Sequence, residues 1–174
     1  MRIKKVLNSS VVLVEDDAHQ ESILLGKGIG YGQKPGNVIA QRQENQVFLP
    51  VDNARSRQIV ELVNSLPVAI LELAQEIVID AQQRFKTPLG ENLVFVLADH
   101  LNFALERIRT GMVITNRVFW EIKSFYPQEF EAGLHAVEQV RQRLGVELPE
   151  QEAAGAGLLK RYAVSAQPPF SPSA

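Results

Sequence analysis

The chain has 174 residues, of which 45% are apolar and 22% charged, a normal globular composition that excludes a mostly disordered protein. The net charge is −2, with eight Lys/Arg against six Asp/Glu in residues 1–57 and ten against fourteen in residues 58–174. The absence of cysteine excludes disulfides and thiolate metal sites. With neither a signal peptide nor an apolar stretch of about 18 residues, we expect a cytoplasmic protein with no membrane insertion.

The first third of the chain has the pattern of short β-strands. Apolar runs flank Asn8–Ser10, whose residue types favour a turn, so the segment is predicted to form an antiparallel hairpin. A third strand is predicted at Glu21–Gly26 and a fourth at Val47–Leu49. We therefore expect a small four-stranded antiparallel β domain in residues 1–57.

A glycine-rich stretch, Gly26–Gly36, has five glycines in eleven positions. No helix follows it in a βαβ unit and it has no Walker pattern, so it does not indicate a nucleotide-binding loop. Lys27, Lys34 and Tyr31 suit phosphate contacts and base stacking on RNA, and Lys5 with Asn8–Ser10 extends such a surface. A flexible hairpin loop with a solvated basic face is the alternative.

From Asn53 onward the apolar spacing becomes helical. After a linker near residues 50–66, helices are predicted at Ile70–Ala81 behind Pro67, from residue 91 or 92 to about Arg109, from an Asn116 N-cap to Phe125, from Pro127 to a stop at Gly145, and after Pro149. The fold class is α+β, with an all-α helical bundle at residues 66–160 and a disordered tail at residues 161–174.

His100 is the histidine with the most suggestive surroundings. It lies mid-helix beside Asp99, with Arg107 two turns later, where a cation could receive a phosphoryl group on the imidazole. A structural histidine is the alternative, and neighbouring helix positions do not face each other. His19 and His135 are expected on the surface. No metal-ligand set, catalytic triad or cofactor motif is found, so we do not expect an enzyme.

Several separated motifs, in order and spacing over residues 1–152, resemble the BglG family of transcriptional antiterminators. Residues 1–14 and 23–31 resemble its N-terminal co-antiterminator domain. The regulatory domain controlled by the sugar phosphotransferase system is resembled by Leu97–Arg107, Glu121–Phe130 and Gly145–Glu152.

The resemblance implies a mechanism. A homodimer formed through the N-terminal sheet would hold a leader mRNA hairpin of a sugar-utilisation operon, so that the overlapping terminator does not form. Carried over by position, the RNA contacts are Lys5, Asn8, Ser10, Gly26, Lys27 and Tyr31. His100 would be the phosphoacceptor, supported by Asp99 and Arg107, with a sugar permease and a histidine phosphocarrier as partners.

Three features depart from the family. Ser10 stands where the family usually has asparagine, the second regulatory domain is missing, and Leu159 stands near the position of a second histidine. These departures imply an incomplete regulatory domain that lacks its final helix and is under-packed, through either a frame change or divergence. The alternative function is a truncated signalling module that binds phosphotransferase components without productive RNA binding.

Overall fold

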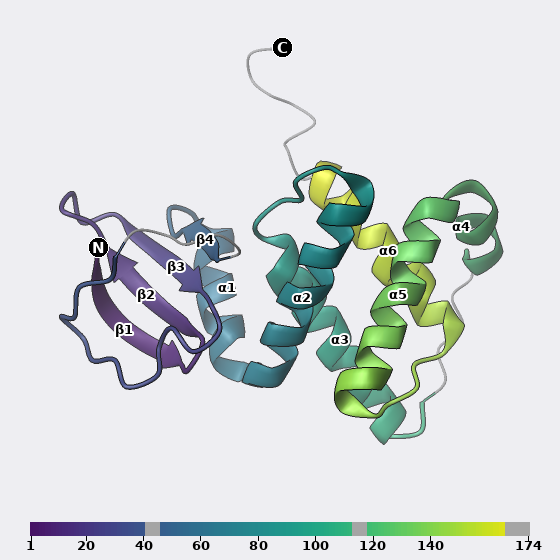
Figure 1. The fold of residues 1–174 in the computed structure, drawn as a ribbon, viewed down its shortest axis with the longest axis horizontal. Helices are drawn as coiled ribbons and strands as arrows, with labels where there is room; N and C mark the ends of the chain where they lie inside the picture. The colour runs from purple at the N-terminus through teal and green to yellow at the C-terminus, as the bar shows by residue number, and fades with distance from the viewer. Residues whose placement is uncertain (41–45, 113–117, 166–174) are drawn as a thin grey trace, which may run out of the picture. The chain divides into compact units, whose positions relative to one another are not determined.

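The computed structural model describes residues 1–40, 46–112 and 118–165, and the chain divides into two compact units, Met1–Glu72 and Leu73–Ala174. Over these described residues, four strands come first and six helices follow (Figure 1). This order confirms the predicted α+β class, a small sheet followed by helices.

The sheet contains β1 (Arg2–Asn8), β2 (Val11–Glu15), β3 (Glu21–Leu25) and β4 (Val47–Pro50). Its spatial order is β1-β2-β3-β4, and every neighbouring pair is antiparallel, as predicted. The predicted turn at residues 8–10 joins the first two strands, so the hairpin is confirmed.

Both faces of the sheet are buried. Alternate residues of a strand point to opposite faces, and Val12, Val14 and Leu24 form one cluster together with Ile29 and Ile39 from the segment after β3. The opposite face carries other side chains that have no exposed surface, Val11, Ile23 and Leu25.

The predicted linker near residues 50–66 is wrong, because this segment forms helix α1 (Ala54–Ser65). Its start is a capping box: the Ser56 amide donates to Asn53 Oδ1 at 2.9 Å, and the Asn53 amide donates to Ser56 Oγ at 3.2 Å. Ile59 and Val63, four residues apart on one side of α1, are buried, and α1 contacts β1. The capping box and this spacing stabilise a helix in the segment that was expected to be a linker.

The remaining helices follow the predicted order. They are α2 (Val68–Phe85), α3 (Leu93–Arg109), α4 (Phe119–Phe125), α5 (Pro127–Leu144) and α6 (Glu150–Ser165). Pro127 begins α5 and Gly145 ends it with φ 68°, in the left-handed region, as its sequence position predicts. The proposed Asn116 N-cap lies outside the described residues.

The expectation that the final helix is absent is also wrong. Helix α6 continues to Ser165, past the boundary at residue 161 where the tail was predicted to begin. It crosses α5 closely, since a methyl group on Gly133 would lie 2.7 Å from the carbonyl carbon of Ala153, and one on Gly157 would lie 2.7 Å from that of Glu129. Glycine at both positions lets the two backbones approach.

The core of the second unit, Leu73–Ala174, includes a cluster where α4, α5 and α6 meet. Its buried members are Phe119, Ile122, Phe130, Ala153 and Ala154. Two of the rings, Phe119 and Phe130, pack edge to face with centroids 5.7 Å apart. Within the described residues, no helix has both the length and the apolar character needed to cross a membrane.

Candidate nucleic-acid interface and histidine cluster

Backbone hydrogen bonds join the turn between β1 and β2 to the glycine-rich stretch after β3. The Gly26 amide donates to the Ser10 carbonyl at 2.9 Å, and the Gly30 amide donates to the Ser9 carbonyl at 2.8 Å. Within the turn, the Ser10 amide donates to Asn8 Oδ1 at 2.9 Å. The structure thus brings Gly26, from the stretch after β3, next to the turn that contains Asn8 and Ser10, and all three are predicted RNA-binding positions.

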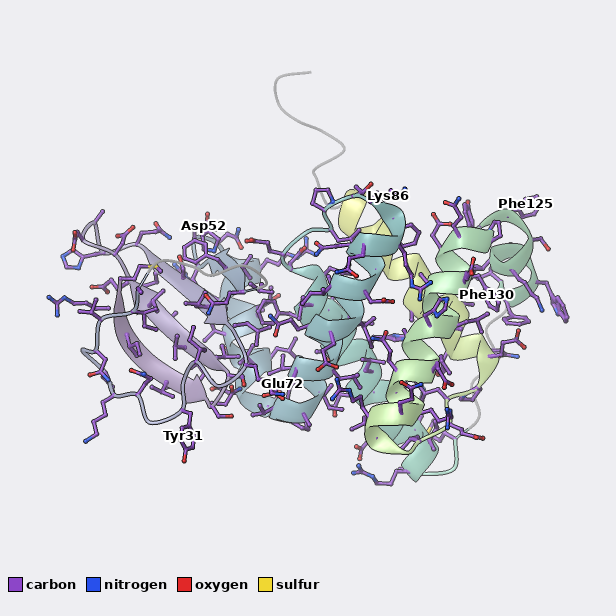
Figure 2. The ribbon with its side chains drawn as sticks, in the orientation of Figure 1. Tyr31, Asp52, Glu72, Lys86, Phe125 and Phe130 are labelled. Carbon is purple, nitrogen blue, oxygen red and sulfur yellow. The ribbon has the colours of Figure 1, made fainter. Side chains whose placement is uncertain are left out.

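Ser10 lies in the turn between β1 and β2 and is fully buried. Its hydroxyl accepts a hydrogen bond from the Gly28 amide at 3.2 Å and donates one to Glu72 Oε1 at 2.7 Å. Glu72, labelled in Figure 2, belongs to the same compact unit. In this arrangement the Ser10 hydroxyl holds the loop and is not offered to a ligand.

Glycine is required at two positions of the loop. Gly28 has φ 73°, which side-chain-bearing residues rarely adopt. A methyl group on Gly30 would collide with the backbone carbonyl oxygen of Asn8. The side-chain amide nitrogen of Asn8 is buried and has no hydrogen-bond partner among the residues the structure describes. The loop is therefore closely packed on the turn, with one amide donor unused.

The remaining predicted RNA contacts are exposed. Tyr31 is 81% exposed and projects outward from the loop (Figure 2), and Lys5 and Lys27 are exposed as well. Lys4, next to Lys5, is paired instead, with Nζ 3.7 Å from Glu15 and 3.4 Å from Glu21. Among the described residues, no carboxylate forms an ion pair with Lys5 or Lys27. Two cations and an aromatic ring are therefore available to a nucleic acid.

His100 lies on α3 opposite the first turn of α6. Its Nε2 is 3.4 Å from Glu152 Oε2, and Arg107 Nη2 donates to Glu152 Oε1 at 2.6 Å. All three side chains are largely buried, with 26% of His100, 14% of Arg107 and 13% of Glu152 exposed. The structure thus brings the predicted pair His100 and Arg107 together, with Glu152 between them.

His100 and Arg107 stabilise the Glu152 carboxylate. The contact with His100 above all, and the hydrogen bond from Arg107, hold its pKa below the ordinary value despite burial, which acts in the opposite direction. The carboxylate is therefore ionised near neutral pH. The 3.4 Å separation between His100 Nε2 and Glu152 Oε2 is long for a hydrogen bond.

Glu152 was missed as a site residue, although it ends one of the motifs quoted above. The sequence shows an acidic residue near the start of a predicted helix, but it does not show which side chain of another helix that residue contacts. Asp99, predicted as a supporting residue, is exposed on α3 and makes no ion pair with any other described residue. His19 is 85% and His135 39% exposed, so the expectation of surface positions holds for both.

No group of three or more His, Asp or Glu side chains within the described parts of the chain could hold a metal ion. Comparison with known families divides the chain much as the geometry does. Residues 1–57 match the model of the CAT RNA-binding domain, and residues 75–154 match the model of the PRD domain. The chain is a CAT–PRD protein.

Two curated relatives of this chain are named as antiterminators. The chain is 33% identical over 167 residues to the beta-glucoside operon antiterminator of Dickeya chrysanthemi, covering 96% of this chain and 58% of that protein. It is 30% identical over 167 residues to the transcription antiterminator LicT of Bacillus subtilis (strain 168), covering 96% and 59%. The CAT–PRD chain therefore spans less than two thirds of the length of these relatives.

A solved structure supports the same fold. The crystal structure of GlcT CAT-PRDI is similar with a TM-score of 0.85 at 27% identity, covering 94% of this chain and 98% of that one. In the CAT–PRD chain, the loop surface with Lys27 and Tyr31 lies in the CAT match, while His100, Arg107 and Glu152 lie in the PRD match.

Proposed function

We propose that this CAT–PRD chain is an RNA-binding transcription antiterminator regulated by phosphorylation of His100. It acts in the cytoplasm on the leader mRNA of a sugar-utilisation operon, where it holds a hairpin and thereby prevents the overlapping terminator. The names of its relatives support this role, as does the match of residues 1–57 of this chain to the CAT RNA-binding domain. It is a regulator and not an enzyme.

The observation that carries the proposal is a set of exposed side chains, Lys5, Lys27 and Tyr31, which we call the loop surface. Lys5 and Lys27 are exposed cations that can neutralise phosphates, and the exposed Tyr31 ring can stack on an unpaired base. Gly26 and Asn8 are engaged within the loop and the turn, where Gly26 donates to the Ser10 carbonyl and Asn8 Oδ1 accepts from the Ser10 amide, so they support the surface from within. Ser10 acts from below by keeping the Gly28 amide in place, rather than through direct RNA contact.

His100 is the proposed phosphoacceptor, and proteins of the sugar phosphotransferase system, a permease and a histidine phosphocarrier, are the proposed donors. The PRD match and the guanidinium of Arg107 within the same cluster support this assignment. Arg107 supplies the positive charge that a phosphorylated side chain needs. Asp99 is exposed and forms no ion pair with the other described residues, so it takes a lesser part.

A homodimer formed through the N-terminal sheet is also proposed, by resemblance to the family. Both sheet faces are buried within one chain, so pairing requires either the edges of the sheet or displacement of a covering segment such as α1. The molar mass of the full chain in solution, with and without RNA, tests this proposal.

The RNA-binding proposal is tested by gel shift, using the full chain and a leader hairpin that overlaps the terminator of a sugar operon. Tyr31→Ala is expected to weaken binding by about 1–3 kcal/mol, the contribution of one base stack. Phe125→Ala is the matched control, because Phe125 is also an exposed ring, 75% exposed, but lies on α4. Equal affinities for all three proteins would remove Tyr31 from the interface. Absence of RNA binding, with phosphorylation of His100 retained, would favour the signalling-module alternative.

A further inference from the structure

A cluster of three charged or titratable side chains joins α3 to the first turn of α6. Arg107 and Glu152 form its ion pair, with 2.6 Å between Nη2 and Oε1, and the second carboxylate oxygen lies 3.4 Å from His100 Nε2. A methyl group on Gly155, one turn after Glu152, would lie 3.3 Å from His100 Cε1, so α6 packs directly against the imidazole.

Two nitrogen atoms of the cluster make no hydrogen bond with the described residues. His100 Nε2 and Arg107 Nε are both buried, and neither has a hydrogen-bond partner among the residues the structure describes. A buried guanidinium N–H without an acceptor reduces the stability of the fold, and a further acceptor bound next to it would remove this cost. A phosphoryl group, with three acceptor oxygens, is such an acceptor.

The Glu152 carboxylate already occupies part of the space that this group needs. Oxygens of a phosphoryl group on Nε2 would extend toward Oε2, which is the nearest acidic atom to that nitrogen. A phosphoryl group carries about −1.5 to −2 charges near neutral pH, and the ionised carboxylate would repel it at this range. Arg107 is the cation within the cluster, and a guanidinium can bind either a carboxylate or a phosphate through paired N–H groups.

We propose that Glu152 holds the place of the phosphoryl group in the unphosphorylated chain. Phosphorylation of His100 at Nε2 then transfers Arg107 from Glu152 to the phosphoryl group and releases the first turn of α6 from α3. Glu152 is thus a positioning residue that sets the reactivity of His100 and couples its modification to α6. This inference rests on the proposed phosphorylation of His100.

Phosphoramidate tests the site without any partner protein. In this reaction the nitrogen–phosphorus bond of phosphoramidate breaks and a bond from phosphorus to His100 Nε2 forms. The proton released from the imidazole ring ends on the departing nitrogen, which leaves as ammonia. Phosphorus NMR of the full chain follows the reaction and distinguishes a phosphoryl group on Nε2 from one on Nδ1, and His100→Ala identifies the His100 signal.

Glu152→Gln keeps the shape of the side chain and removes its charge. It is expected to raise the rate of His100 phosphorylation by about tenfold, because the repulsion is lost. Glu150→Gln is the matched control, since Glu150 lies in the same helical turn but pairs with Lys123 at 3.5 Å; its rate should equal that of the unchanged chain. Hydrogen exchange provides a second readout: in the unchanged chain, phosphorylation should speed the exchange of amides in residues 150–156.

The outcomes separate this inference from the proposed function. If His100 is not phosphorylated in the unchanged chain or in Glu152→Gln, the assignment of His100 fails and the role of Glu152 fails with it. If His100 is phosphorylated but Glu152→Gln reacts equally fast or more slowly, only the role of Glu152 is overturned. A phosphoryl group on Nδ1, or unchanged exchange in residues 150–156 after phosphorylation, also overturns it, even if the Gln variant does not fold.

Discussion

At the scale of single residues, Ser10 shows how burial determines what a polar group can do. Its hydroxyl has two partners, the Gly28 amide and Glu72, and no exposed surface. An asparagine or serine at a turn can either bind a ligand or order the backbone, and the hydrogen bonds here favour ordering. The effect of Ser10 on RNA binding would then come through the position of the glycine-rich loop.

Ser10→Ala is therefore expected to destabilise the first unit, because the substitution leaves the Gly28 amide and the Glu72 carboxylate without this partner. The expected loss is about 1–3 kcal/mol, the range for leaving a buried polar group unsatisfied. Urea denaturation of the full chain measures it. Ser9→Ala is the control, since the Ser9 side chain is exposed; equal stability of both variants would show that the Ser10 hydroxyl does not order the loop.

Glu152 gives a prediction for the dependence of stability on pH. Its pKa in the folded chain is lowered, chiefly by His100 and then by Arg107, so its stabilising contribution is present above the unfolded pKa of about 4.3. That contribution is lost as the pH falls through the lower, folded pKa.

Glu152→Gln should accordingly reduce the loss of stability on acidification below about pH 4.3, while Glu150→Gln should keep it. Thermal unfolding of the full chain and both variants over a series of acidic buffers provides the comparison. If the unfolding temperature falls with pH equally in the unchanged chain and in Glu152→Gln, other carboxylates account for acid unfolding.

At the scale of elements, small residues decide how α6 packs. Gly133 and Gly157 let α5 and α6 approach, and Ala156 with Gly157 lines an apolar cavity of about 40 Å³ between these helices and their neighbours. The expectation of an under-packed bundle rested on the absence of the final helix. Helix α6 is present and packs closely on α5 through these glycines.

Gly133→Ala is expected to destabilise the chain, although alanine is by about 1 kcal/mol the better helix former at an unconstrained site. The added methyl group would meet the carbonyl of Ala153, and overpacking of this kind typically costs about 1–3 kcal/mol. Thermal unfolding measures the change. Gln128→Ala, at an exposed position of α5, is the control; a stabilised Gly133→Ala variant would show that α6 can move away without cost.

At the scale of the whole molecule, charge is divided between a slightly basic N-terminal part and an acidic remainder. The two additional positive charges of residues 1–57 are few, so RNA affinity must depend on particular exposed cations rather than on an overall field. Lys5, Lys27 and Lys34 are exposed candidates, whereas Lys4 is paired with two carboxylates.

RNA affinity of the full chain is expected to fall as salt rises, because phosphate neutralisation releases counterions. Lys27→Ala should flatten the plot of log affinity against log salt by roughly 0.7–0.9, the value for one lost phosphate contact. Lys86→Ala should leave the slope unchanged, since Lys86 follows α2 and is remote in sequence from the loop. A slope that Lys27→Ala does not alter would exclude a phosphate contact by Lys27.

The sequence by itself determined the strands, most of the helices and the two-part organisation. Alternating apolar runs, the turn at Asn8–Ser10, the proline at the start of α5 and the glycine at its end are local signals, and each produced its element where predicted. The prediction is wrong for residues 54–65, where a linker was expected and α1 forms, and for the final helix, which was expected to be missing because the sequence departs from the family pattern after Glu152.

Only the tertiary structure decided how the site residues are used. Sequence named Ser10 and His100, but burial directed the Ser10 hydroxyl to Glu72, and helix packing placed Glu152 between His100 and Arg107. Ser10 and Glu72 are 62 positions apart, and Arg107 and Glu152 are 45 apart. Contacts over such separations depend on how whole elements pack, whereas strand and helix patterns depend on neighbours a few residues away.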